Sequence, residues 1–325
     1  MKRREKFCFL ILSALLFFAF TLIPAQVPVS HPQSPKRERE KERFELVVRY
    51  APVIYQCAKS DQDYITKADF DGDWISNNNW DNQPDYPLKA YLYYSLVESK
   101  THFFIFYSLF HPRDYEPVCS WISCHENDLE SIQVVIKKDK TKFGKLIILE
   151  TLAHGNIFLY SNEEEIKGGY LKVKGEITLE ESHPVVFVEV YGHGIYGKST
   201  DSYRANPSLW KTVVYRYRGK AEVPKSINDK DTSYELISIY DSLWRHREEV
   251  GEGRAFDKIF NYKGERLPAY FDGNDYGIDR ANTPWGYNQA TGGGVVQGDW
   301  FFDPAKAIIF HAGKIPNFSQ EYVYP

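Results

Sequence analysis

Short runs of apolar and aromatic residues recur along the chain from residue 49 onward, and clusters of Gly, Asn, Asp and Pro separate them. The runs cover residues 51–55, 90–96, 102–110, 131–137, 145–152, 184–191 and 211–218. Runs of this length between turn-forming clusters are typical of β-strands. We therefore expect a mainly β protein with a β-sandwich or jelly-roll-like core and long loops.

The spacing of apolar residues changes near residue 236. Leu236, Ile239, Tyr240, Leu243 and Trp244 follow the intervals of an amphipathic helix. The pattern predicts a helix whose apolar stripe docks on a sheet, and we expect one or two such docked helices in the whole chain.

A loop-rich extension is expected from about residue 221. Gly, Asn and Asp are concentrated in residues 270–303, where they favour the turns of long ordered loops, which are often functional. Within this tract, Trp285 and Tyr287 could contact a sugar or a lipid headgroup, because aromatic rings bordered by polar groups form such sites. The alternative is that the tract only covers a sheet edge.

The N-terminus has the pattern of an export signal. A basic start precedes an apolar run over residues 7–23, and cleavage after Ala25 would fit the Pro24-Ala25-Gln26 segment. The alternative is a single membrane anchor. We expect a signal peptide at 1–25, a charged linker or exposed helical turn at 26–44, and one β-sandwich domain at 45–325. The protein is thus expected to be secreted or to reside in the periplasm or cell envelope, and to be membrane-anchored if the leader is retained.

Composition narrows the fold and the partners. The chain has 24 Tyr, 21 Phe and 7 Trp but a single Met, and aromatic enrichment suits sheets better than helical bundles. The net charge is −4, and removal of the basic leader would make it more negative, which disfavours nucleic acid as a partner. No second apolar segment could span a membrane.

Two of the four cysteines stand in one short loop. Cys119 and Cys124 lie immediately before His125, and export would permit a disulfide between them. The small ring could also be too strained to close. Cys57 is expected to be a buried, unreactive thiol.

Acidic residues occupy an unusual place in the strand around residue 131. Asp128 and Glu130 share the parity of Ile132 and Val134, so in a strand they face the core. Buried carboxylates must be neutralised, hydrogen-bonded or bound to a cation. The nearby oxygen and imidazole donors suit Ca²⁺, Mg²⁺ or Mn²⁺ better than Zn²⁺, and the expected metal ligands are Asp114, His125, Asp128 and Glu130.

Two further histidines each end an apolar run and precede a glycine. His154 and His193 could line the same cavity as a general acid or base, since imidazole titrates near physiological pH. The alternative is that both are hydrogen-bonded structural residues. Glu189 has the parity of Phe187 and His193; an inward and an outward orientation are equally compatible with this pattern, and Glu189 is not assigned to the site.

The segments Tyr107-Ser-Leu-Phe-His-Pro-Arg-Asp114 and His125-Glu-Asn-Asp-Leu-Glu130 resemble the core of the necrosis- and ethylene-inducing peptide-like proteins, whose signature is Gly-His-Arg-His-Asp-Trp-Glu. That resemblance implies a β-sandwich and a divalent cation held by the four expected ligands. Cys124, Asn127 and Leu129 depart from the signature, and these departures weaken any transfer of toxic activity.

The chain also resembles the Vps62-related proteins over roughly residues 50–195. The matching segments are Ala51-Pro-Val-Ile-Tyr55, Ala153-His-Gly155 and the strand from Pro184 to Gly194.

These features lead to three functional hypotheses. The first is an exported cation-binding β-sandwich that recognises a lipid headgroup or glycan at a cell surface. The second is a metal-dependent hydrolase that uses His154 or His193 to move protons. The third is a structural envelope protein whose cation only holds loops in place.

Overall fold

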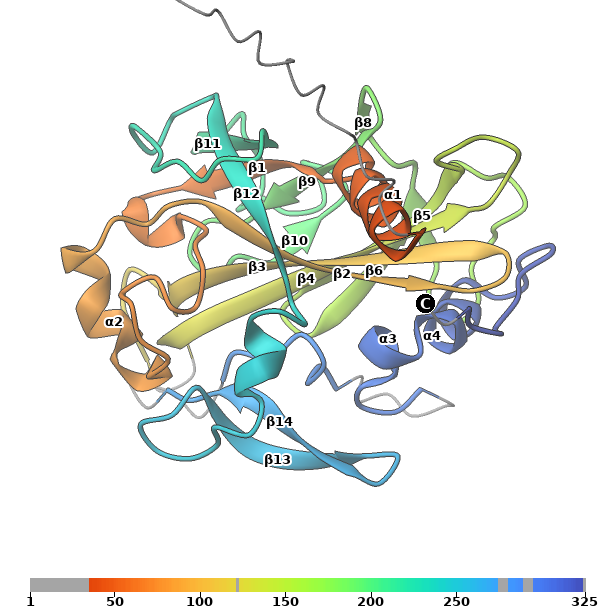
Figure 1. Cartoon of the computed structure of the whole chain (residues 1–325). Coiled ribbons are helices and arrows are strands. Elements are labelled where there is room, and N and C mark those ends of the chain that lie inside the picture. The colour runs from red at the N-terminus through yellow and green to blue at the C-terminus, as the bar shows by residue number, and fades with distance from the viewer. Residues whose placement is uncertain (1–34, 121–122, 274–279, 289–294, 324–325) are drawn as a thin grey trace, which may run out of the picture.

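The structure is a computed structural model that describes residues 35–120, 123–273, 280–288 and 295–323 (Figure 1). The expected leader at 1–25 lies outside these residues, as does the part of the expected linker before Pro35. Within the described chain, no helix is both long enough and apolar enough to cross a bilayer.

A curled, mixed sheet of 12 strands forms the body of the protein. Its strands follow the order β10-β9-β1-β11-β12-β2-β3-β4-β5-β6-β7, and β8 pairs with β9. The bounds are β1 Val53–Ala58, β2 Tyr91–Glu98, β3 His102–Asp114, β4 His125–Lys137, β5 Lys145–Ala153, β6 Asn156–Tyr160, β7 Val173–Gly175, β8 Leu179–Glu180, β9 His183–Val188, β10 Ile195–Tyr196, β11 Lys211–Tyr217 and β12 Thr232–Ser238. The mainly β fold predicted from the sequence is confirmed.

The two halves of the curled sheet enclose one large apolar cluster. Ile54 and Val213 come from one half, and Ile105, Val134 and Leu149 come from the other. All five are buried. Because apolar side chains from both halves meet in this way, the core is sandwich-like.

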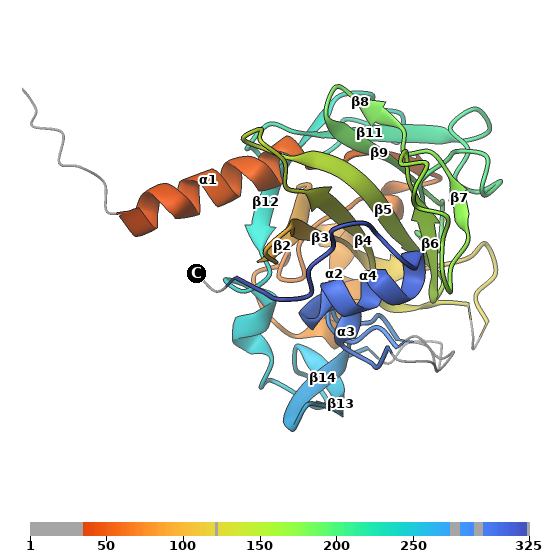
Figure 2. The same ribbon diagram turned by 90° about the vertical axis from the view of Figure 1, so that its right-hand side faces the viewer.

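Helices accompany the sheet, and α4 packs on one of its faces. They are α1 Pro35–Arg49, α2 Asn79–Asn82, α3 Asp299–Phe302 and α4 Pro304–Ala312, with 3₁₀ helices η1 Asp61–Asp63, η2 Ser76–Asn78, η3 Gln83–Asp85 and η4 Leu243–His246. Figure 2 shows α1 projecting away from the sheet, while α3 and α4 lie against it. Ala305 and Ile308 of α4 pack on Val135 and Ile148, so α4 closes the face opposite the main cluster.

The predicted helix from Leu236 to Trp244 is wrong. Leu236 belongs to strand β12, which pairs in parallel with β11 and β2, and only Leu243 and Trp244 lie in the short helix η4. The buried residues come from a strand, a turn and a 3₁₀ helix in succession. Their spacing therefore matched a helical period although no single element contains them.

The charged tract before residue 44 is an exposed helix, one of the two forms expected for it. Residues 36–43 are largely exposed in α1, whereas Leu46, Val47 and the following Tyr50 join the main apolar cluster. Burial of this last turn fixes the helix to the sheet, and neighbouring Lys and Glu residues add weak surface ion pairs.

A separate hairpin lies below the sheet, formed by β13 Phe256–Tyr262 and β14 Glu265–Phe271 (Figure 1). Phe256 and Phe271 pack against Trp285, which is 1% exposed. The C-terminal tract thus contributes a second core cluster between the hairpin and the sheet.

Candidate functional site

The long strands β3 and β4 bring the four expected metal ligands to one end of the sheet. Asp114 ends β3 and lies opposite His125, the first residue of β4. Asp128 and Glu130 follow on the same strand. The four side chains line one cavity of about 220 Å³, together with His154 and Gly192 from two other segments.

Burial and mutual repulsion dominate the electrostatics of this cavity. Burial raises the pKa of the Asp114 carboxyl well above its ordinary value, and the charge of Asp128 raises it further. The pKa of Glu130 is raised well above its ordinary value for the same two reasons. Clustered acids of this kind are stabilised by protonation, by a bound cation or by a cationic side chain, and Arg280 lines the same cavity.

One carboxylate oxygen is buried without a hydrogen bond. Glu130 is 6% exposed, and its Oε1 accepts the backbone N–H of His154 at 3.1 Å. Its Oε2 is buried and has no hydrogen-bond partner within the described chain. A buried, unsatisfied oxygen is costly unless another group, such as a cation, occupies the space it faces.

Two stacked, buried histidines lie next to Asp128, and one of them contacts its carboxylate. His193 Nδ1 lies 3.0 Å from Asp128 Oδ2, and its Nε2 lies 3.4 Å from Asp63 Oδ1. Burial would lower the pKa of His193, but the two carboxylates outweigh burial and raise it to about 10. The ring of His193 stacks on that of His111 with a centroid distance of 3.7 Å and an angle of 5° between planes, and burial lowers the pKa of His111.

His111, Asp128 and His193 form a candidate metal-binding group, with one ligand atom of each within 4.8 Å of the others. The stacking of the two rings argues against a shared ion. An imidazole lone pair lies in the ring plane, so an ion in the plane of His111 would lie well outside the plane of His193. We therefore assign His193 to the support of Asp128, whose carboxylate also faces the cavity, and His111 to the support of the His193 ring.

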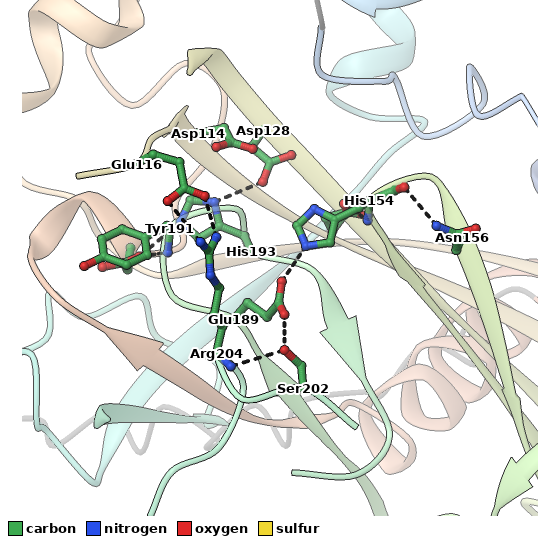
Figure 3. A network of polar contacts seen from close by, with 12 residues as sticks. Asp114, Glu116, Asp128, His154, Asn156, Glu189, Tyr191, His193, Ser202 and Arg204 are labelled. Carbon is green, nitrogen blue, oxygen red and sulfur yellow. Dashed lines mark hydrogen bonds and ion pairs between the residues drawn. The ribbon is translucent and has the colours of Figure 1, made fainter. Parts of the chain in front are cut away.

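His154 lies on the opposite wall of the cavity, and its side chain is 49% exposed. Its Nε2 lies 2.5 Å from Oε2 of Glu189, and the hydrogen bond to Glu189 raises the pKa of His154. Ser202 donates its hydroxyl to the other Glu189 oxygen. Figure 3 shows this chain of contacts below the Asp114 and Asp128 carboxylates.

Strained backbone gathers around the cavity. Four residues other than glycine have positive φ here: Asn127 at 59°, His154 at 49°, Tyr191 at 78° and His193 at 50°. Such conformations cost free energy and persist where the surroundings enforce them, often at functional sites. Asn127, between two cavity residues of β4, donates its amide to the carbonyls of Ser76 and Asp272.

The other expected site residues occupy different environments. Trp285 and Tyr287 are 1% and 6% exposed, and they donate to the carbonyls of Pro268 and Gly155. Their rings pack in the core, so the expected contact with a ligand is corrected to a structural role. Cys119 and Cys124 form a disulfide, and Cys57 is buried.

Sequence reasoning missed three buried residues that support the site. Asp63 comes from η1, His111 from the middle of β3, and Glu189 follows β9. Glu189 carried a weak signal, since in the sequence it has the parity of His193, which is buried. Asp63 and His111 carried none, because their contacts depend on strands that are distant in sequence.

Comparison with known proteins gives limited information. No family model and no curated protein matches the chain. Among solved structures, Necrosis and Ethylene inducing Protein 2 from the causal agent of cocoa's Witches Broom disease is 15% identical, with a TM-score of 0.32 over 63% of this chain and 79% of that chain. The non-toxic HaNLP3 protein is 15% identical, with a TM-score of 0.32 over 66% of this chain and 80% of that chain.

A third similar structure is NLPPya in complex with glucosamine, at 14% identity and a TM-score of 0.31 over 48% of this chain and 68% of that chain. Structural neighbours therefore include necrosis- and ethylene-inducing proteins at low identity. Scores this low carry no argument about the fold or function of the present chain. The resemblance to Vps62-related proteins stays a prediction.

Proposed function

We propose that the protein is an exported divalent-cation-binding protein whose cation helps to recognise a glycan or a lipid headgroup. The observation that carries the cation site is the buried, unsatisfied Oε2 of Glu130 in a cavity shared with two other carboxylates. A cation would satisfy that oxygen and remove the repulsion that raises the pKa values of Asp114 and Glu130.

The donor set favours a hard ion. Asp114, Asp128 and Glu130 offer carboxylate oxygens, and His125 offers one nitrogen, with its Nε2 3.6 Å from Asp114 Oδ2. Oxygen-rich sets of this kind suit Mg²⁺, Ca²⁺ or Mn²⁺. The described chain brings no cysteine to the cavity lining, which is a further reason to rank Zn²⁺ below these ions.

The proposal of a glycan or lipid headgroup as the bound molecule follows from the chemistry of such an ion. Hard cations keep some positions for water or for ligand oxygens, and vicinal hydroxyls or phosphate oxygens can replace that water. The half-exposed His154 shows that the cavity wall is accessible. The complexes of NLPPya with glucosamine and mannosamine concern that protein, and they suggest amino sugars as probes here.

The cation site is tested by elemental analysis and calorimetric titration of the wild type and Asp128→Ala with Mg²⁺, Ca²⁺, Mn²⁺ and Zn²⁺. We expect one tightly bound ion in the wild type and at least a tenfold loss of affinity in the variant, because an anionic ligand is removed. Asp241→Ala is the matched control, since this acid is exposed, pairs with Arg245 at the surface and does not line the cavity. Full stoichiometry and wild-type affinity in Asp128→Ala would refute the site.

Ligand recognition is tested on glycan arrays and with vesicles bearing glycosylated or phosphorylated headgroups, each with cation and with chelator. We expect binding that chelator abolishes. If chelation lowers the melting temperature and no ligand binds in either condition, the structural envelope hypothesis replaces recognition. Export is tested by sequencing the N-terminus of the mature protein, which we expect to begin at Gln26.

A hydrolase remains the second candidate, because His154 lines the same cavity as the acids. His193 is fully buried, which leaves His154 as the histidine able to reach a substrate. Cation-dependent cleavage of phosphoesters or glycosides that His154→Ala abolishes, with metal content preserved, would establish this activity.

A further inference from the structure

The turn that carries His154 is built to fix the position of its side chain. Residues 154 and 155 form a two-residue hairpin turn between Ala153 and Asn156, which are paired across β5 and β6. Both turn residues have positive φ, 49° for His154 and 75° for Gly155. Asn and Gly usually occupy such turns, so the histidine is held there against its backbone preference.

Contacts from elsewhere in the chain hold this turn. Tyr287 donates its hydroxyl to the Gly155 carbonyl at 2.6 Å, and Asn156 donates its amide to the His154 carbonyl at 3.2 Å. The backbone N–H of His154 donates to Glu130. The turn is therefore tied directly to a cavity carboxylate.

The imidazole is oriented by a buried carboxylate. Glu189 is 4% exposed; its Oε2 accepts from His154 Nε2 at 2.5 Å, and its Oε1 accepts from Ser202. With Nε2 carrying the proton that Glu189 accepts, the neutral ring presents its lone pair at Nδ1. Metal-binding histidines almost always donate their other nitrogen in this way.

The Cε1–Nδ1 edge of the ring lies on the side of the Asp114 carboxylate. A Cβ atom placed on Gly192 would lie 2.9 Å from His154 Cε1, 3.6 Å from His154 Nδ1 and 3.5 Å from Asp114 Oδ2. That edge of the ring and the Asp114 carboxylate thus lie around the same point. Figure 3 shows the ring between Glu189 on one side and the Asp114 and Asp128 carboxylates on the other.

We propose that His154 Nδ1 is a further ligand of the cation, oriented by Glu189 and, through Glu189, by Ser202. The inference rests on the proposed cation site and names a ligand outside the segment from Asp114 to Glu130. The set would then hold two nitrogens, from His125 and His154, which both line the cavity.

The test uses the full exported chain loaded with Mn²⁺, whose pulsed electron paramagnetic resonance detects coordinated histidine nitrogen. His154→Asn removes the imidazole and keeps a residue that accepts positive φ. We expect this variant to lose one of two nitrogen couplings and to bind Mn²⁺ at least tenfold more weakly. Glu189→Gln should retain both couplings and weaken binding about tenfold, as loss of an outer carboxylate partner typically does.

His183→Gln is the control, since His183 bonds the Ala51 carbonyl and does not line the cavity; its couplings and affinity should match the wild type. Unchanged couplings and affinity in His154→Asn would overturn the inference, even if Asp128→Ala loses the ion and so supports the cation site. If Asp128→Ala instead keeps both the wild-type nitrogen couplings and the wild-type Mn²⁺ affinity, the proposed function is overturned. The melting temperatures of the wild type and His154→Asn are compared in chelator, and agreement within a few degrees shows that the variant is folded. If His154→Asn does not fold, Glu189→Gln tests the same geometry.

Discussion

Individual histidines in this protein differ because their neighbours differ. His193 lies between two carboxylates, and its pKa is raised to about 10. His102 is equally buried, but its nearest charges are Lys137 and Lys138, and burial followed by these cations lowers its pKa to about 4. The same side chain is therefore charged in one place and neutral in another at the same pH.

The neutral state of His102 predicts acid sensitivity. The unfolded chain takes up a proton near pH 6.5 and the folded chain does so only near pH 4, so the free energy of unfolding should fall as pH drops through this interval. The loss should be on the order of 3 kcal/mol. Urea unfolding of the wild type and His102→Gln between pH 4 and pH 7 tests this, and equal slopes in the two proteins would contradict it.

At the scale of elements, the end of the β3–β4 hairpin determines the site. Asp114 and His125 are paired across the hairpin, and the Cys119–Cys124 disulfide closes most of the loop between them. Cys124 is buried and directly precedes His125. The crosslink thus restricts the backbone that leads into a proposed ligand.

Replacement of both cysteines by serine should weaken the hairpin end. For so short a loop, chain entropy predicts a loss of about 2 kcal/mol in the free energy of unfolding. We also expect a lower cation affinity, because His125 would lose a fixed neighbour. Calorimetry with and without reductant measures both the stability and the cation affinity. Reductant should lower both in the wild type toward the values of the variant and leave the variant unchanged. Equal cation affinities in the wild type and the variant would show that the disulfide does not affect the site.

At the scale of the whole molecule, the cavity couples stability to pH and to the cation. The pKa values of Asp114 and Glu130 are raised in the folded chain, so the unfolded chain releases these protons first as pH rises. Without cation, the contribution of these groups to stability should therefore decrease as pH rises above the ordinary carboxyl range.

A bound cation should reverse that trend. At a concentration 100 times its Kd, it should add about 2.7 kcal/mol to the free energy of unfolding, and the gain should be larger at pH 7.5 than at pH 5, where protons compete for the same oxygens. Chemical denaturation at both pH values, with cation and with chelator, measures the four free energies. If the cation adds the same free energy of unfolding at both pH values, it binds away from Asp114 and Glu130.

The sequence predicted what depends on local pattern. Strands such as β3, β4 and β5 were found because their apolar runs are continuous. Asp114 and Glu130, which lie on β3 and β4, line one cavity as expected, and their role as cation ligands stays a prediction. The interior of the 236–244 segment was misassigned because a strand and a 3₁₀ helix together imitated a helical period. Trp285 was misjudged because its polar neighbours in sequence are not its neighbours in space, where Phe256 and Trp244 contact it.

The separation of Glu189 and Asp63 from the β3–β4 hairpin has a consequence for protein engineering. A transplant of residues 102–137 into another sheet would carry four donor groups. It would lack Glu189, which contacts His154, and Asp63, which contacts His193. The grafted hairpin would hold an ion loosely, because its side chains would be free to rotate. A functional transfer requires η1, with Asp63, and the segments that follow β5 and β9 to move with it.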